Sequence, residues 1–121
     1  MASPDTCVWF EIPTSDLERA RAFYGAVLDR ELAVSDGGPN PIVALTAMDD
    51  SGVSGHLYPG TPAPGAGPTI HLAAPGGIGA AAERVRAAGG AIVSEPIAIP
   101  SGRFVYATDP DGNSIGLYEG N

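Results

Sequence analysis

Three side chains stand out as able to carry chemistry, and all three sit in runs that read as β-strands. The chain has only two histidines, His56 and His71, and a carboxylate, Glu11, interrupts the apolar run 7–12. Imidazole and carboxylate groups can move protons at neutral pH or hold a divalent ion with open positions. Because a carboxylate on an apolar strand needs a partner or shifts its pKa, Glu11 is the candidate general base. The simpler interpretation of Glu11 is a structural pair with His71 or Arg103.

The composition narrows the class of protein. With 121 residues, the chain has the length of one compact domain, residues 1–121. A formal charge of −8 disfavours nucleic acid and anionic membrane as partners. No apolar run reaches the ~18 residues of a membrane span, and no signal segment opens the chain, so we expect a soluble cytoplasmic protein. The single cysteine, Cys7, excludes an internal disulfide, and its apolar neighbours predict a buried thiol.

Hydrophobic periodicity predicts the elements of the first half. In 7–12, the alternation places Val8, Phe10 and Ile12 on one face of a strand. A capping box, Ser15 with Glu18, predicts the start of a helix whose apolar residues then recur at helical spacing. Further strands are predicted at 31–34, 42–47 and 53–58.

The second half repeats this order. Residues 108–118 echo residues 48–58 at an offset of sixty positions, which indicates a duplicated unit. The second unit is predicted to have strands at 69–74, 91–94, 103–107 and 114–118 and a helix at 78–88. A connector, 59–68, holds four prolines and three glycines and sustains neither helix nor central strand. The fold class is therefore α+β, with two tandem βαβββ half-modules, 1–58 and 69–121, forming curved mixed sheets around a cavity.

Alternation along the strands also predicts the binding residues. Apolar residues such as Ile12, Leu57 and Leu117 should face the helices, so their neighbours face the opposite way. That opposite face is rich in polar and aromatic side chains, as expected of a concave small-molecule site. The predicted ligand-binding residues are Trp9, Glu11, His56, Tyr58, His71 and Tyr118. The bland interpretation is that the aromatic residues only fill space and that the histidines only make structural hydrogen bonds.

Several motifs together resemble the vicinal oxygen chelate superfamily, which includes glyoxalase I, bleomycin-resistance proteins and extradiol dioxygenases. The resemblance covers nearly the whole chain, and no single motif would be specific. It rests on the paired units and on the segments Phe10-Glu11-Ile12-Pro13, Asp16-Leu17-Glu18-Arg19-Ala20, Phe23-Tyr24, Gly89-Gly90 and Asp109-Pro110-Asp111-Gly112-Asn113. It implies a cavity between the half-modules and a homodimer, and it does not specify a reaction.

The resemblance also implies four positions for metal ligands, and this chain departs from them. The positions fall on Trp9, His56, Thr69 (or His71 with a one-residue slip) and Gly116. Trp9 and Gly116 have no ligating side chain, so the usual metal centre is not favoured. The alternative is that His56, His71 and Glu11 hold a divalent ion such as Fe, Mn, Ni or Zn.

The sequence thus leads to one function with alternatives. We expect a small-molecule-binding protein of the glyoxalase and bleomycin-resistance type, without the usual metal centre or another cofactor. The protein either sequesters its ligand or converts it, and the sequence does not distinguish the two. If the chain is an enzyme, the resemblance implies a metal-dependent lyase, isomerase or dioxygenase that uses His56, His71 and Glu11. A structural or regulatory dimer with a vestigial cavity is the third interpretation.

Overall fold

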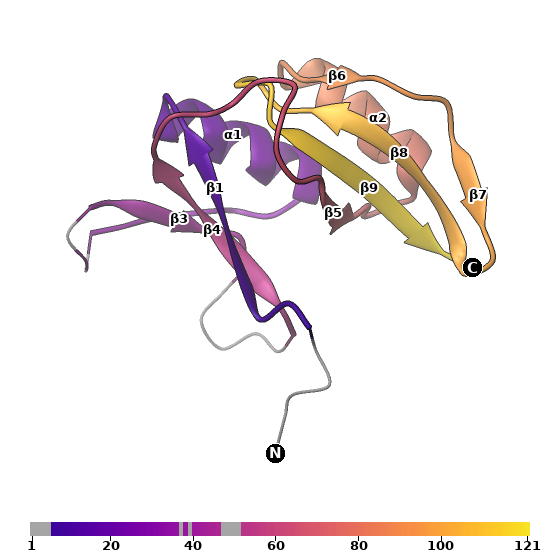
Figure 1. Ribbon diagram of the computed structural model, residues 1–121, viewed down its shortest axis with the longest axis horizontal. Helices are drawn as coiled ribbons and strands as arrows, with labels where there is room; N and C mark the ends of the chain where they lie inside the picture. The colour runs from indigo at the N-terminus through magenta and orange to yellow at the C-terminus, as the bar shows by residue number, and fades with distance from the viewer. Residues whose placement is uncertain (1–5, 37, 39, 47–51) are drawn as a thin grey trace.

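The computed structural model describes residues 6–36, 38, 40–46 and 52–121 (Figure 1). Its first half has one helix and four strands. These elements are β1 (Trp9–Thr14), α1 (Leu17–Leu28), β2 (Val34–Ser35), β3 (Ile42–Ala44) and β4 (Ser54–Pro59). The strand predicted at 42–47 reaches Ala47, and the echo begins at Met48–Ser51; both of these parts lie outside the described residues.

The second half repeats this order and adds one strand. Its elements are β5 (Ile70–Ala73), α2 (Ile78–Ala87), β6 (Ala91–Ile92), β7 (Ile97–Ile99), β8 (Gly102–Thr108) and β9 (Ser114–Gly120). The sequence analysis missed β7, which is short and lies between two prolines, Pro96 and Pro100. Residues 60–69 contain neither helix nor strand, as expected of the connector, and they pass over the top of Figure 1 from β4 to β5.

Each half folds into its own sheet. Sheet A has the strand order β1-β4-β3-β2, and sheet B has the order β5-β9-β8-β6, with β7 also paired to β8. Within each sheet the first strand pairs in parallel with the last, β1 with β4 and β5 with β9, whereas the other pairings are antiparallel. The mixed α+β architecture with two repeated units is therefore confirmed.

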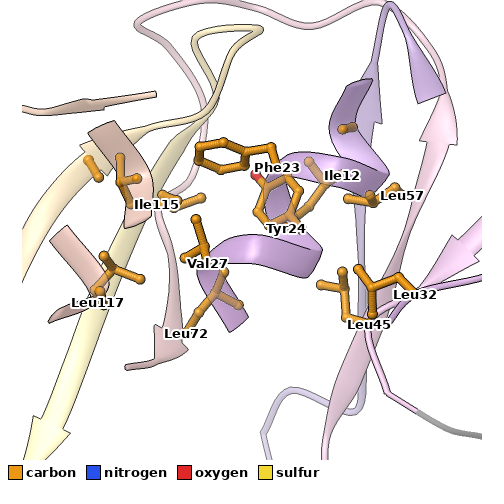
Figure 2. Close-up of a cluster of buried hydrophobic side chains, with 14 of the residues drawn as sticks. Ile12, Phe23, Tyr24, Val27, Leu32, Leu45, Leu57, Leu72, Ile115 and Leu117 are labelled. Atoms are coloured by element: carbon orange, nitrogen blue, oxygen red, sulfur yellow. The ribbon is translucent and has the colours of Figure 1, made fainter. Parts of the chain in front are cut away.

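One hydrophobic core joins the two halves. Helix α1 buries Phe23, Tyr24 and Val27, and these side chains lie between residues of both sheets (Figure 2). Ile12 and Leu57 reach this core from sheet A, and Ile115, Leu117 and Leu72 reach it from sheet B. The predicted helix-facing residues are thus confirmed. Because the core is shared, neither sheet buries its apolar face independently of the other half.

The start of α1 differs from the prediction. Asp16, rather than Ser15, is the N-cap, and its carboxylate accepts a hydrogen bond of 3.0 Å from the backbone N–H of Arg19. Ser15 instead donates its hydroxyl proton to Asp111. Either residue type can cap a helix, so the choice was set by a partner far away in the sequence.

Helix α2 has no cap of its own and takes one from a neighbouring strand. Its N-cap is Gly77, which has no side chain to offer. The carboxylate of Glu119 on β9 accepts a 2.7 Å hydrogen bond from the N–H of Ile78. This backbone bond is the main reason that the pKa of Glu119 is lowered, and the nearby Arg103, whose Nε lies 3.4 Å away, lowers it further. At the other end, Gly89 has φ +99°, a left-handed conformation that glycine adopts readily after the end of a helix.

The first residues of the described chain are more exposed than predicted. Cys7 is exposed, so the predicted buried thiol is wrong, and Val8 is 67% exposed although it was assigned to the buried face. Both residues precede β1, which begins at Trp9. Alternation assigns faces only within a strand, and it therefore fails for residues outside one.

The turn 109–113 fastens the second half to the start of α1 in the first half. The side chain of Asp111 is only 6% exposed, and its carboxylate accepts hydrogen bonds from the Thr14 hydroxyl (2.6 Å) and from the Arg19 guanidinium (2.7 Å). Burial alone would raise the pKa of Asp111, but the bonds from Ser15 and Thr14 and the charge of Arg19 outweigh burial and lower it. This turn thus joins the two halves.

A second carboxylate in the same turn is buried. Asp109 is 4% exposed, and it accepts hydrogen bonds from the Tyr24 hydroxyl (2.7 Å), the Asp111 N–H (2.9 Å) and the Asn113 N–H (2.9 Å). The Asn113 amide spans both halves, since it donates to Asp109 and to the carbonyl of Pro13, each at 2.9 Å. Both carboxylate oxygens of Asp109 therefore accept hydrogen bonds, which offset the cost of burying the group.

Candidate functional site

Glu11 and His56 meet on the outer face of sheet A. In the parallel register of β1 and β4, Glu11 is opposite His56. The imidazole Nε2 lies 3.1 Å from Glu11 Oε1. The sequence prediction that these residues share a face is confirmed, whereas the suggested partners of Glu11, His71 and Arg103, are wrong.

Trp9 completes a chain of three hydrogen-bonded side chains. Its indole N–H, which is a donor only, lies 2.9 Å from His56 Nδ1. Nδ1 must therefore accept, so the hydrogen of neutral His56 is on Nε2, where it donates to Glu11. Trp9 is thus more than a filler of space, because it selects the tautomer of His56.

A cavity of about 290 Å³ lies beside this chain of side chains. Glu11, His56 and Tyr58 line one wall, as the sequence predicted of all three. The remaining lining residues are Ser35, Gly38, Asn40, Ile42 and Pro59. These residues were not predicted from the sequence. The first four belong to the short strands β2 and β3 and the segment between them, where nothing in the pattern distinguishes a wall from a connector, and Pro59 is the last residue of β4. We call this space the outer-face cavity.

The charge of the outer-face cavity is one-sided. Among the described residues, its lining contains the Glu11 carboxylate and no Lys or Arg. The Glu11 side chain is 62% exposed and that of His56 is 15% exposed, so the carboxylate reaches solvent while the imidazole is mostly covered. Among the residues with described positions, nothing donates to Glu11 Oε2, which leaves this oxygen available to a ligand. The wall can therefore accept hydrogen bonds from a neutral or cationic donor.

The structure places the other two predicted residues, His71 and Tyr118, on sheet B. His71 packs edge-on against Phe104, with ring centroids 5.1 Å apart, and near Tyr106 at 5.9 Å. A Cβ added to Gly116 would come within 2.2 Å of His71 Nδ1, so the imidazole occupies the space that a side chain at Gly116 would fill. The hydroxyl of Tyr118 donates to the carbonyl of Ser101 at 3.0 Å. Neither residue lines the outer-face cavity.

The predicted alternative metal set is not assembled within the part of the chain that is described. Across residues 6–36, 38, 40–46 and 52–121, no three His, Cys, Asp or Glu side chains are grouped so that they could hold an ion. The hydrogen bonds of His56 add a second difficulty. Coordination through Nε2 would require the hydrogen on Nδ1, where it would oppose the indole N–H of Trp9. The residues present therefore do not fit the ion that the resemblance implies.

Comparisons with known proteins agree on the family. Residues 6–117 match the model of the Glyoxalase/Bleomycin resistance protein/Dioxygenase superfamily. A Mycobacterium bovis protein named "Putative glyoxylase CFP32" is 33% identical over 109 residues, which cover 88% of this chain. This chain spans 41% of the length of that relative.

Solved structures show the same fold. A glyoxalase/bleomycin resistance protein from Albidiferax ferrireducens T118 matches with a TM-score of 0.75 and 22% identity, covering 94% of this chain and 98% of that one. TnmS3, an antibiotic binding protein from Streptomyces sp. CB03234, matches with a TM-score of 0.64 and 25% identity, covering 99% of this chain and 100% of that one. No helix in the described parts is long and apolar enough to cross a membrane. The chain belongs to the Glyoxalase/Bleomycin resistance protein/Dioxygenase superfamily, the vicinal oxygen chelate superfamily.

Proposed function

We propose that this protein binds a small organic molecule in the outer-face cavity, without a metal ion held by His56, His71 and Glu11. The observation that carries the proposal is the set Trp9, His56 and Glu11, which is joined by hydrogen bonds of 2.9 and 3.1 Å and of which His56 and Glu11 line a space of about 290 Å³. Polar groups held in place beside an apolar wall are the usual form of a small-molecule site. The antibiotic-binding relative with the same fold adds support.

The ligand is neutral or cationic and has at least one hydrogen-bond donor. Glu11 Oε2 accepts that donor, and Tyr58 and Ile42 contact the flat apolar part of the molecule. An anionic ligand would meet the Glu11 carboxylate with no Lys or Arg among the described lining residues, in a protein whose formal charge is −8. The same carboxylate is the group best placed for a general base if the ligand is converted.

Three naphthalene probes that differ in the charge and the hydrogen-bond donors of one substituent test this proposal. Naphthylmethylamine and naphthalenemethanol are expected to bind, and naphthoate is not. The protein has a single tryptophan, and Trp9 is hydrogen-bonded to the wall residue His56, so a change in Trp9 fluorescence reports on that wall indirectly; amide NMR shifts at His56 and Tyr58 locate the probe. Equal binding of naphthoate, or binding that leaves His56 and Tyr58 unshifted, would contradict the proposal.

A charge-neutral variant separates the role of Glu11 from a general effect of net charge. Glu11→Gln should weaken naphthylmethylamine binding by about fivefold, the size of an exposed ion pair, and should change naphthalenemethanol binding less, because a hydroxyl can accept from the amide N–H that replaces Oε2. Glu95→Gln removes the same charge at an exposed position outside the cavity and serves as the control. If both variants weaken the amine equally, Glu11 is not the contact.

The metal-dependent lyase, isomerase or dioxygenase is the alternative. It needs His71 beside Glu11 and His56, so its test is a thermal melt with chelator and then with Mn, Fe(II), Ni or Zn. A rise in Tm that His71→Ala abolishes would favour the metal-dependent enzyme, because an ion stabilises only the state that holds it. A metal-independent Tm supports the binding protein.

We further propose a cytoplasmic homodimer. Support for the dimer comes from apolar side chains on the outer faces: Trp9 on sheet A is 47% exposed, and Ile97 and Ile99 of β7 on sheet B are 37% and 40% exposed. Covering such side chains with a second copy would remove them from water. Light scattering over a dilution series tests this proposal, and a monomer mass at all concentrations would refute the dimer.

A further inference from the structure

A second cavity, separate from the outer-face cavity, lies where the two half-modules meet. It measures about 190 Å³, and we call it the seam cavity. Its apolar walls come from β1, from the connector and from the starts of β5 and β9; the main contributors are Ile12, Pro13, Ala66, Pro68, Ile70 and Ile115. The connector crosses from β4 to β5 above this region (Figure 1). Every occupant would therefore touch both half-modules and the segment that joins them.

The walls of the seam cavity are held in place independently of any ligand. The amide of Asn113 donates to the Pro13 carbonyl at 2.9 Å, which ties the start of β9 to the end of β1. The N–H of Gly65 donates to the Gly112 carbonyl at 3.4 Å, which ties the connector to the turn 109–113. Because the walls are already fixed, binding a ligand there costs less free energy for ordering the protein.

One polar atom at the seam cavity, Asn113 Oδ1, can still accept a hydrogen bond. Both hydrogens of the Asn113 amide are engaged, one with Pro13 and one with Asp109, so its remaining polar atom is Oδ1. Nothing among the described residues donates to this oxygen, and it is not sealed off from solvent or cavity space. The hydroxyl of Ser114, by contrast, lies 2.5 Å from that of Thr69 and is already paired.

The charge of the lining restricts the ligand further. Glu11 borders the cavity, and within the described part of the chain no Lys, Arg or His side chain does so. An anion would therefore meet a carboxylate and no cation. The size of the cavity sets the other limit, because an apolar cavity of about 150 Å³ is known to hold benzene, so 190 Å³ accepts one ring with a small substituent.

We propose that the seam cavity binds a neutral monocyclic phenol, with the ring between Ile12, Ile70 and Ala66 and the hydroxyl donating to Asn113 Oδ1. The ring is apolar enough for the walls, and its one strong donor matches the acceptor Asn113 Oδ1. The phenol contacts both half-modules, so its binding stabilises their joined state. The seam cavity shares Glu11 with the outer-face cavity, but this proposal does not depend on the function proposed for that cavity.

Amide NMR with p-cresol as the probe tests the proposal. Saturable shifts are expected at Ala66, Gly67, Ile70 and Ser114, with the amides of His56 and Tyr58 unmoved. Toluene, which lacks the donor, should bind several-fold more weakly, and p-toluate, which is anionic, should not bind. Shifts that do not saturate, or equal binding of p-toluate, would overturn the proposal. Shifts confined to His56 and Tyr58 would also overturn it, while leaving the outer-face proposal intact.

A variant that fills the cavity gives the second arm of the test. Ala66→Leu adds three carbons to the lining at an exposed connector position and should weaken p-cresol binding at least about tenfold. Ala98→Leu makes the same change on β7, away from the cavity, and should bind as wild type does. If the spectrum of Ala66→Leu shows a disturbed fold, Ala63→Leu fills the same cavity from the same connector. Undiminished binding by a folded filling variant refutes the assignment.

Discussion

Tyr24→Phe removes one buried hydrogen bond between the half-modules and almost no volume. Tyr24 is fully buried, and its hydroxyl donates to Asp109 at 2.7 Å. Losing a hydrogen bond to a charged acceptor costs about 1.5–3 kcal/mol. With an unfolding entropy of about 2.1 cal/mol/K per residue, the 121 residues give about 250 cal/mol/K, so a loss of ~2 kcal/mol lowers Tm by about 8 °C.

The same bond predicts a pH dependence. Burial raises the pKa of Tyr24 well above its ordinary value, and the neighbouring Asp109 carboxylate raises it further. The unfolded tyrosine titrates near pH ~10, below the folded one, so its contribution to stability is complete below that pH. It is lost as the pH rises toward the folded pKa. The wild type should therefore lose stability above pH ~10 more steeply than Tyr24→Phe does.

Urea unfolding followed by circular dichroism measures both effects. Tyr106→Phe is the matched control, because its hydroxyl has no hydrogen-bond partner in the described part of the structure. The control should change the free energy of unfolding by less than about 0.5 kcal/mol. If Tyr24→Phe is no less stable than Tyr106→Phe, the bond to Asp109 does not hold the halves together as argued.

Three further predictions concern single contacts. Asp111→Asn should be less stable than wild type at neutral pH. The difference in free energy of unfolding should shrink as the pH falls below ~4, because a carboxylate whose pKa is lowered by folding contributes in full only above its unfolded pKa. Urea melts at several pH values test this. Trp9→Phe removes the donor to His56 Nδ1, so nitrogen NMR of the imidazole should change from one tautomer to a mixture, and an unchanged spectrum would refute the assignment. Gly116→Ala should displace the His71 ring from Phe104, because the new Cβ would lie 2.2 Å from His71 Nδ1. Ring-current shifts in the NMR spectrum report this displacement, and unchanged shifts would count against the packing described.

Much of the fold was predictable because it depends on local patterns. The alternation of Phe10 and Ile12 with Trp9 and Glu11, and the helical spacing of Phe23, Tyr24 and Val27, are properties of neighbouring residues. What escaped prediction depends on distant partners. Ser and Asp are equally good N-cap residues, so the sequence around 15–16 does not choose between them. The Ser15 hydroxyl donates instead to Asp111, which is 96 positions away in the chain.

The candidate site was predictable in part for a related reason. Alternation identifies the face of a strand, so it placed Glu11, His56 and Tyr58 together correctly. It does not say which sheet a strand joins. His71 and Tyr118 have the right alternation but belong to sheet B, so the six predicted residues fall into two groups.

The fastening of residues 14–19 by residues 109–113 also bears on synthesis and folding of the chain. The hydrogen-bond acceptor shared by three side chains is Asp111, which lies 97, 96 and 92 positions after Thr14, Ser15 and Arg19. While a ribosome makes this chain, α1 emerges long before the carboxylate of Asp111 exists. Contacts across such separations slow folding, because a long loop must close before they are formed. The first half-module should therefore remain only partly ordered until the last hairpin, β8 with β9, has been made, and for that period it should expose the apolar side chains that the second half later covers.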